Sequence, residues 1–161
     1  MKNYNPDENQ SFLSLAVDLA KKNIEKGGGP FGAVIVKQGN LISSAVNQVT
    51  LSHDPTAHAE VMAIRKASEK LGNHDLSDCV IYSSTEPCPM CLGAIYWAGI
   101  KKLVFASGKA DAEKAGFIDA HIYREMGKEI DKRELDTVQM QVPGAGDEFK
   151  AWIEKMDKTS Y

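Results

Sequence analysis

Three short apolar runs constrain the fold of this 161-residue chain more than any other feature. They occupy residues 33–36, 79–82 and 103–106. Strands that are apolar at nearly every position are typical of a sheet that helices cover on both faces. Patterns of helical period separate the later runs, and strand–helix–strand units in succession imply parallel neighbours joined by right-handed crossovers. The sequence therefore predicts an α/β fold in which these three runs are central strands.

The first half of the chain adds a helix and a hairpin to this prediction. Apolar residues recur with helical spacing over residues 11–26, and the run Gly27-Gly28-Gly29-Pro30 ends that helix. No Gly-Lys-Ser/Thr follows these glycines, so they do not match a phosphate-binding loop, and we interpret them as a stop and a turn. The turn at residues 38–40 leads into a second strand over residues 41–46, which indicates a hairpin.

The second half of the chain is predicted from weaker signals. Two further helices begin near residues 58 and 88 and end near Leu71 and Gly99. Beyond residue 107 we expect a short helix at 109–115, a helix through 122–126, a fifth strand at the sheet edge over 138–142, a flexible joint at 143–146 and a last helix over 149–156.

Two motifs begin the helices near residues 58 and 88. The first is H-x-E at residues 58–60, and the second is P-C-x-x-C at residues 87–91. Together they match the known signature of zinc-dependent base deaminases. The chemistry explains the match, because a catalytic zinc keeps three protein ligands and leaves its fourth position for water. His58, Cys88 and Cys91 are the candidate ligands, and Glu60 is then free to transfer protons.

The expected local structure places these four residues at helix starts. Cys88 and Cys91 are three residues apart and share one helical face. A helix N-terminus favours the thiolate form of a nearby cysteine. His58 and Glu60 are two residues apart and do not share a face, so we expect one to reach the metal while the other lies over the open coordination position.

Other interpretations of the motifs are weaker. A C-x-x-C pair alone could be a redox pair or a structural zinc site. The upstream H-x-E motif and the proline before Cys88 favour catalytic zinc. The third cysteine, Cys79, lies in an apolar run and is expected to pack as a small core residue.

Composition bears on compartment and partners. Three cysteines form no disulfide framework, which fits a reducing compartment, and we expect a cytoplasmic protein. The net charge of −3 argues against a nucleic-acid partner, because domains that bind nucleic acids usually carry a basic excess. No apolar run approaches the ~20 residues of a membrane span, so no membrane partner is expected.

With these residues in view, the chain resembles the cytidine deaminase superfamily, and within it the bacterial guanine deaminase family. The resemblance extends over nearly the whole chain, on residues 28–36, 54–61, 86–98 and 115–117, with Ala151, Trp152 and Tyr161 near the end. The zinc motif is common to the superfamily. The run at residues 94–97 and the final Tyr161 are narrower and point to guanine deaminases.

The resemblance implies an architecture. It is a cytidine deaminase-like, three-layer α/β/α sandwich around a five-stranded mixed sheet, formed by residues 1–161 as a single zinc-dependent deaminase domain. It also implies a domain-swapped homodimer that exchanges a C-terminal segment of about residues 143–161. The implied reaction is the hydrolysis of guanine, a small-molecule purine, to xanthine and ammonia, with one Zn²⁺ per subunit.

The resemblance also implies a role for each matched residue. His58, Cys88 and Cys91 would bind zinc, and Glu60 would be the catalytic proton shuttle. Four residues would contact the substrate. Asn47 would hydrogen-bond the purine, although its own context favours a turn residue; Phe31 would line or stack on the ring; Asp119 would meet the guanine edge; and the partner subunit's Tyr161 would help to close the pocket.

Several alternatives stay open at this point. A tRNA adenosine deaminase shares the zinc motif, but RNA binding should bring a basic face. Cytosine, an aminotriazine or a pterin could also be the substrate, since nothing in the spacing excludes them. A non-catalytic, zinc-stabilised binding module is a further alternative, and Glu60 argues against it because structural zinc needs no acid beside an open position.

Overall fold

A hairpin followed by two crossovers builds the sheet of this protein. The computed structural model describes residues 6–159, with side chains from Asn9 onward. Its strands are β1 (Gly32–Lys37), β2 (Asn40–Val46), β3 (Cys79–Thr85) and β4 (Lys102–Ser107), in the spatial order β2-β1-β3-β4. The hairpin and all three apolar runs predicted as strands are confirmed.

The strand directions correct one prediction. β3 and β4 are parallel, as expected, but β1 is antiparallel to both β2 and β3. The reason is the hairpin, which reverses the chain before the first crossover. Gln38 and Gly39 have φ angles of 50° and 76°, the positive values that a two-residue hairpin turn of type I′ requires. The crossover units are therefore β2–α3–β3 and β3–α4–β4.

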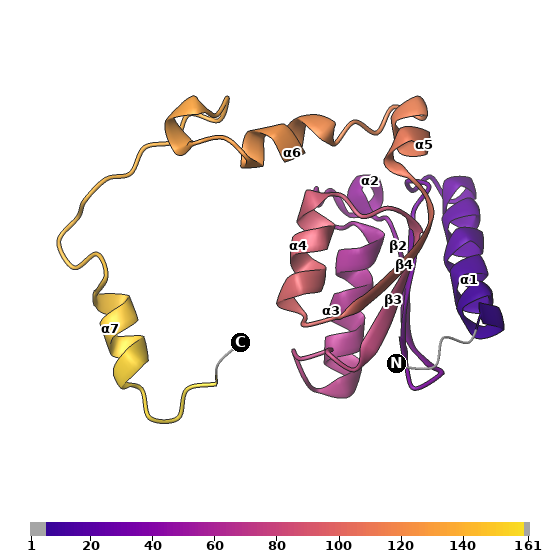
Figure 1. The fold of residues 1–161 in the computed structure, drawn as a ribbon, viewed down its shortest axis with the longest axis horizontal. Helices are drawn as coiled ribbons and strands as arrows, with labels where there is room; N and C mark the ends of the chain where they lie inside the picture. The colour runs from indigo at the N-terminus through magenta and orange to yellow at the C-terminus, as the bar shows by residue number, and fades with distance from the viewer. Residues whose placement is uncertain (1–5, 160–161) are drawn as a thin grey trace. The chain divides into compact units, whose positions relative to one another are not determined.

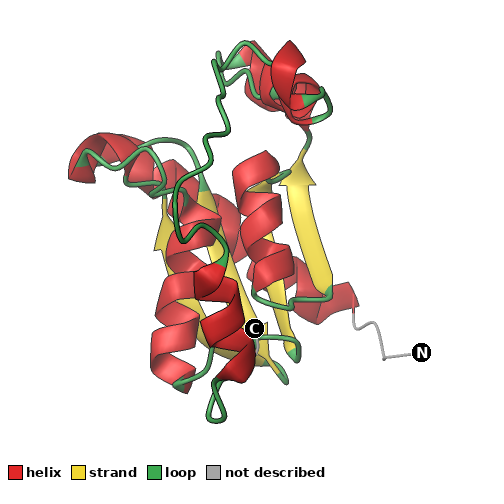
Figure 2. Ribbon diagram, turned by 90° about the vertical axis from the view of Figure 1, so that its left-hand side faces the viewer, coloured by secondary structure: helices red, strands yellow, loops and turns green. Residues whose placement is uncertain are grey.

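Helices cover both faces of the sheet, in three layers (Figures 1 and 2). Successive side chains of β1 point to opposite faces. Val34 and Val36 pack with Tyr82 against α1 (Pro6–Glu25), whereas Ala33 and Ile35 pack on the other face. That other face is covered by α3 (Ala59–Leu71) and α4 (Pro89–Trp97). The prediction that helices cover both faces of these strands is thus confirmed.

Two predictions about the sheet edge are wrong. β4 lies at the edge of the sheet and not in its centre. Residues 138–142 form no strand, so the sheet has four strands among residues 6–159 and not five. The alternation of Val138 and Met140 with polar residues suggested a half-buried strand, but their side chains are 73% and 76% exposed and no strand of the described chain pairs with them.

The chain divides into two compact units, one ending at Asp119 and the other beginning at Ala120. The first unit also holds α5 (Lys109–Lys114) and a short helix that was not predicted, α2 (Val49–Ser52). The second unit holds α6 (Ala120–Met126), the 3₁₀ turn η1 (Ile130–Lys132) and α7 (Asp147–Glu154). Across residues 6–159 there is no helix with the length and apolar character needed to cross a membrane.

Candidate metal centre and active site

The starts of α3 and α4 carry the candidate ligands. His58 is the N-cap of α3 and Cys88 is the N-cap of α4, both with extended backbones. Pro89 occupies the first position of α4, where a helix tolerates proline because the missing N–H would have no partner. Neither N-cap side chain bonds an amide of its own helix. Both side chains are therefore available to bind the same metal ion.

The three side chains converge at distances that suit zinc. Nδ1 of His58 lies 3.5 Å from Sγ of Cys88 and 3.5 Å from Sγ of Cys91. All three ligand atoms lie within 4.8 Å of one another. Tetrahedral zinc with Zn–N of about 2.0–2.1 Å and Zn–S of about 2.3 Å separates nitrogen and sulfur ligands by about 3.6 Å. His58, Cys88 and Cys91 therefore form the predicted set of ligands, which we call the metal cluster, and their donor atoms fit zinc.

The charges in this cluster also suit a divalent cation. Hydrogen bonds, first with Cys91 and then with His58, lower the pKa of Cys88 to about 4. The same contact with Cys88, together with burial, raises the pKa of Cys91. The contact with Cys88 raises the pKa of His58. A metal ion compensates the charge of two adjacent thiolates, which is why such ligands bind it in deprotonated form.

Glu60 is a buried acid in the first turn of α3. It is 5% exposed, and this burial raises its pKa. Ser83 donates a hydrogen bond of 2.9 Å to Oε1 of Glu60, and Sγ of Cys91 donates to Oε2 at 3.4 Å. An acid with a raised pKa beside a metal cluster is placed to take up and release protons.

Ser83 was not identified from the sequence. It follows Ile81 by two residues in β3, and Ile81 belongs to the core under α3 and α4. Strand alternation therefore places Ser83 on the face that carries Glu60. A hydroxyl at the end of an apolar strand, in phase with the helix-covered face, was the signal.

Asn47 and Phe31 lie on neighbouring segments. The backbone N–H of Asn47 donates to the carbonyl of Phe31 at 3.0 Å, and the next N–H, that of Gln48, donates to Ala57 at 2.9 Å. Ala57 immediately precedes His58. The structure therefore links both predicted substrate contacts to the segment that leads into the metal cluster.

The described part of the chain does not connect the other two predicted substrate contacts, Asp119 and Tyr161, to the metal cluster. Asp119 is half-buried just before α6, and within residues 6–159 no hydrogen bond joins it to the cluster. Tyr161 lies outside the described residues. The structure adds Phe117, whose ring meets that of Phe31 edge-on at 4.8 Å. Phe117 belongs to a stretch that supports the family resemblance, but sequence reasoning gave it no role.

The fold and the metal cluster together point to one class of protein, and a comparison of the chain with known protein families identifies that class. Residues 6–107 match the family model described as the cytidine and deoxycytidylate deaminase zinc-binding region. The chain belongs to this family. The resemblance inferred from the two motifs is thereby confirmed, and so is zinc as the cofactor of the domain.

Within the family, guanine deaminase of Bacillus subtilis is a similar relative. It is 49% identical over 153 residues, which cover 94% of this chain and 98% of the relative. A crystal structure of guanine deaminase from the same organism superposes with a TM-score of 0.92 at 48% identity, covering 98% of this chain and 99% of that one.

Other relatives match a smaller part of the chain. A tRNA-specific adenosine deaminase of Aquifex aeolicus is 45% identical over 96 residues, which cover 60% of this chain and 64% of the relative. A solved structure in complex with 2,6-diaminopurine has a TM-score of 0.67 and 36% identity, covering 69% of this chain and 62% of that chain.

Proposed function

We propose that this protein is a zinc-dependent hydrolase that converts guanine and water to xanthine and ammonia. The observation that carries the proposal is the 49% identity to a guanine deaminase over 94% of the chain. The match to the tRNA-specific enzyme stops at 60% of the chain, and a net charge of −3 does not favour RNA. A small purine substrate also agrees with the related structure that holds 2,6-diaminopurine.

His58, Cys88 and Cys91 hold one zinc ion per subunit in this proposal. When bound there, zinc would supply a nucleophile at neutral pH, because it lowers the pKa of water to about 7. His58 and Cys88 would hold the ion at the N-termini of α3 and α4, and with Cys91 they supply the three protein ligands typical of a catalytic zinc.

Glu60 moves the protons of the reaction. Its carboxylate takes one proton from the water and delivers it to a ring nitrogen of guanine as the new C–O bond forms at the amine-bearing carbon. It then takes the remaining proton from the newly added hydroxyl and passes it to the departing amine as the C–N bond breaks and the carbonyl of xanthine forms, so that ammonia leaves. Ser83 anchors Oε1 at 2.9 Å and keeps the carboxylate beside the metal cluster during both transfers.

Four residues would hold the purine. Oδ1 of Asn47 accepts a hydrogen bond from the N–H of Val49 at 3.2 Å, which leaves Nδ2 as a donor to a ring acceptor. Phe31 offers an aromatic face or edge to the ring. Asp119 would accept hydrogen bonds from the N–H groups at the guanine edge, and the partner subunit's Tyr161 would close the pocket.

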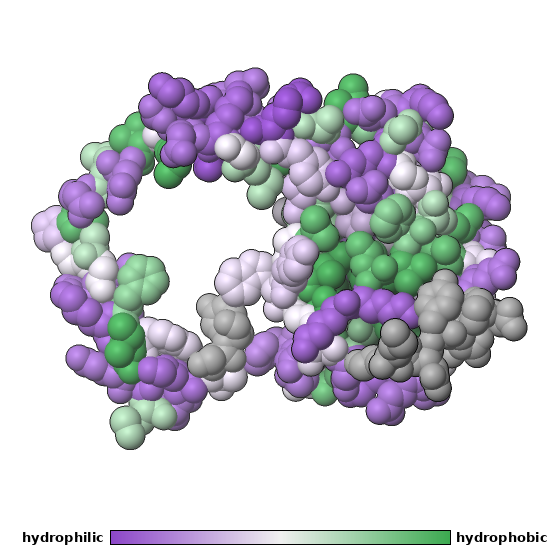
Figure 3. All heavy atoms as spheres, in the orientation of Figure 1, coloured by the Kyte–Doolittle hydropathy of each residue, from purple (hydrophilic) through white to green (hydrophobic). Residues whose placement is uncertain are grey.

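The proposal includes a homodimer that exchanges its C-terminal segments, of about residues 143–161. Support comes from exposed apolar side chains in both units, which usually indicate an interaction surface. Tyr96 and Trp97 in α4 are 75% and 73% exposed, and α7 exposes Phe149 and Ile153. Figure 3 shows hydrophobic residues on the face where β4 lies and also along the second unit.

A cytoplasmic location stays a prediction.

Glu60→Gln tests the reaction. The amide keeps the shape but cannot shuttle protons, so we expect ammonia release from guanine to fall by about 10²–10⁴-fold. Zinc content, measured by atomic absorption, should stay at one ion per chain. Glu69→Gln, an exposed glutamate of the same helix, is the matched control and should keep full activity.

The same assay tests the substrate. Guanine, adenine, cytosine and an aminotriazine are offered separately to the wild-type protein, and ammonia is measured for each. Guanine should be the preferred substrate. Turnover of another base alone would reassign the substrate, and a zinc-loaded protein that deaminates none of them would favour the binding-module alternative.

A further inference from the structure

Asn23 is a buried amide that neither the metal cluster nor the proposed proton transfers use. It lies near the end of α1 and is 2% exposed, although asparagine is mostly found at protein surfaces. Its Nδ2 donates two hydrogen bonds of 2.8 Å, one to the carbonyl of Gly29 and one to the carbonyl of Asn47. One side chain therefore joins two segments that are far apart in the sequence.

These two segments carry the proposed purine contacts. The N–H of Phe31 donates to the carbonyl of Gly29 at 2.8 Å, and the N–H of Asn47 donates to the carbonyl of Phe31 at 3.0 Å. Together with the two bonds from Asn23, these bonds form a closed circuit through Asn23, Gly29, Phe31 and Asn47. The position of either substrate contact thus depends on the same amide.

The glycines before Phe31 are packed tightly against this circuit. A Cβ on Gly28 would lie 2.3 Å from Nδ2 of Asn23, and a Cβ on Gly29 would lie 2.9 Å from Oδ1 of Asn47. A methyl group on Gly28 would therefore displace the Asn23 side chain, and one on Gly29 would displace the Asn47 side chain. The run of glycines therefore does more than end α1, which was the whole role that the sequence suggested for it.

We propose that Asn23 is a positioning residue for substrate binding, which acts by fixing the segments of Phe31 and Asn47. The inference rests on the proposed role of these two residues in holding the purine. Asn23 bonds to none of His58, Glu60, Cys88 and Cys91. Its loss should therefore weaken substrate binding and leave the chemical step largely intact, a pattern seen as a higher KM with little change in kcat.

Asn23→Asp tests this role with a side chain of nearly the same shape. Aspartate lacks the Nδ2 group that donates both bonds and places one carboxylate oxygen against the two carbonyl oxygens. We expect the KM for guanine to rise at least tenfold while kcat changes less than about threefold, measured on zinc-loaded protein. Gly28→Ala is a second, independent variant, because its methyl group would displace the Asn23 amide; it should give the same pattern.

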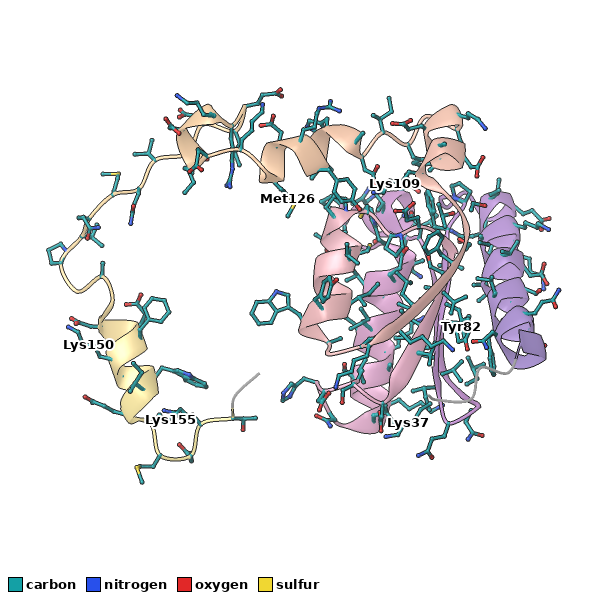
Figure 4. The ribbon with its side chains drawn as sticks, in the orientation of Figure 1. Lys37, Tyr82, Lys109, Met126, Lys150 and Lys155 are labelled. Atoms are coloured by element: carbon teal, nitrogen blue, oxygen red, sulfur yellow. The ribbon has the colours of Figure 1, made fainter. Side chains whose placement is uncertain are left out.

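A buried asparagine at the other end of α1 supplies the control. Asn9 is 6% exposed and its Oδ1 accepts a 2.7 Å hydrogen bond from the hydroxyl of Tyr82, whose side chain lies at the face of the sheet that α1 covers (Figure 4). Asn9→Ala should lower the melting temperature and leave KM and kcat unchanged. A rise in KM in this variant as well would show a general effect of loosening α1 and would overturn the proposal.

Asn47→Ala, measured alongside, separates the possible failures. No ammonia from guanine with the wild-type protein would refute the proposed function itself. An unchanged KM in Asn47→Ala would remove the contact that Asn23 is said to position, and would overturn the inference while leaving the enzyme assignment in place. A raised KM in Asn47→Ala with normal values in both Asn23→Asp and Gly28→Ala would overturn the positioning role alone.

Discussion

At the scale of single residues, the candidate site depends on a few polar groups in apolar surroundings. Glu60 and Ser83 are both buried, and each is the hydrogen-bond partner of the other. A hydrogen bond to a charged group contributes about 1.5–3 kcal/mol, more than one between neutral groups. If Glu60 moves the protons as proposed, replacing Ser83 should have a measurable effect, although its hydroxyl donates to Glu60 and not to a metal ligand.

Ser83→Ala should therefore lower kcat. Without the hydroxyl, Glu60 keeps its place in α3 but loses the bond that orients Oε1, and a loss of about 1.4 kcal/mol corresponds to a tenfold lower rate. We expect kcat to fall about tenfold with KM within about twofold, measured as ammonia release. Ser83→Thr retains the hydroxyl and should recover most of the rate.

Ser84→Ala is the matched control for this prediction. Ser84 is the next residue of β3 and is also buried, and its Oγ accepts a 3.0 Å hydrogen bond from the N–H of Gly32 instead. The control should cost stability and leave kcat unchanged. Equal losses of kcat in Ser83→Ala and Ser84→Ala would mean that strand β3 matters only for folding.

The site residues that sequence reasoning found and missed differ in kind. His58, Cys88 and Cys91 could be predicted because metal ligands need particular residue types at particular spacings. Ser83 and Asn23 act through hydrogen bonds to partners 23 and 24 residues away in the sequence. Serine and asparagine have many ordinary roles, so nothing marks them until the fold brings their partners near.

At the scale of elements, helix starts and strands follow from local pattern, whereas strand neighbours do not. The bounds of α3, α4 and the hairpin lie close to those expected. The direction of β1 relative to β3 was mispredicted as parallel. Alternating strands and helices imply parallel neighbours, but the hairpin that follows β1 reverses the chain, and the two strands are antiparallel. The strand expected at 138–142 failed because alternation describes only one strand, and a strand also needs a neighbour to pair with.

The contact between α1 and β1 gives a prediction about stability. A Cβ on Gly32 would lie 2.3 Å from the backbone oxygen of Ala16, which cannot move without shifting α1. Overpacking of this kind typically costs about 1–3 kcal/mol. Gly32→Ala should therefore lower the melting temperature by roughly 2–12 °C in a thermal unfolding experiment.

A second glycine supplies the contrast for that measurement. No atom lies within 4 Å of a Cβ built on Gly93 in α4, and alanine is favoured over glycine inside helices by about 1 kcal/mol. Gly93→Ala should raise the melting temperature. If Gly32→Ala were as stable as the wild type, the close packing of α1 on β1 would be refuted.

At the scale of the whole molecule, the second unit leaves much apolar surface in contact with solvent. Between Ala120 and Lys158 the exposed large side chains include Leu135, Val138, Met140, Phe149 and Met156. Exposed apolar side chains that lie together often mark an interaction surface. The proposed exchange of C-terminal segments would cover it and would also make each active site depend on two chains.

Complementation tests that dependence. Cys88→Ser lacks a metal ligand, and deletion of Tyr161 removes the residue proposed to close the partner's pocket. If segments are exchanged, a mixed dimer has one site with an intact metal cluster from one chain and Tyr161 from the other. Where each variant alone is inactive, equal amounts of the two proteins, reassorted at random, should recover about a quarter of the wild-type activity.

A mixture of Cys88→Ser and Glu60→Gln is the control for complementation. Both changes lie on the metal side of the site, so every site in a mixed dimer stays defective. No activity should return in this mixture. Failure of the first mixture to recover activity, with mixed dimers verified by mass spectrometry, would show that each chain completes its own site.

Because His58 and Cys88 occupy the N-cap positions of α3 and α4, metal binding there comes at the expense of helix stability. Serine, aspartate and asparagine are the best N-cap residues, and gaining one stabilises a helix by about 1 kcal/mol. Neither helix has such a cap, because both positions are occupied by ligands whose side chains bond no helix amide. In the metal-free chain, replacing either ligand by serine or aspartate should therefore stabilise its helix, whereas in the zinc-loaded protein the loss of metal binding would outweigh that gain. A screen for thermal stability carried out without zinc should therefore measure ammonia release in every round, because it would otherwise select stable proteins that have lost the metal ligands.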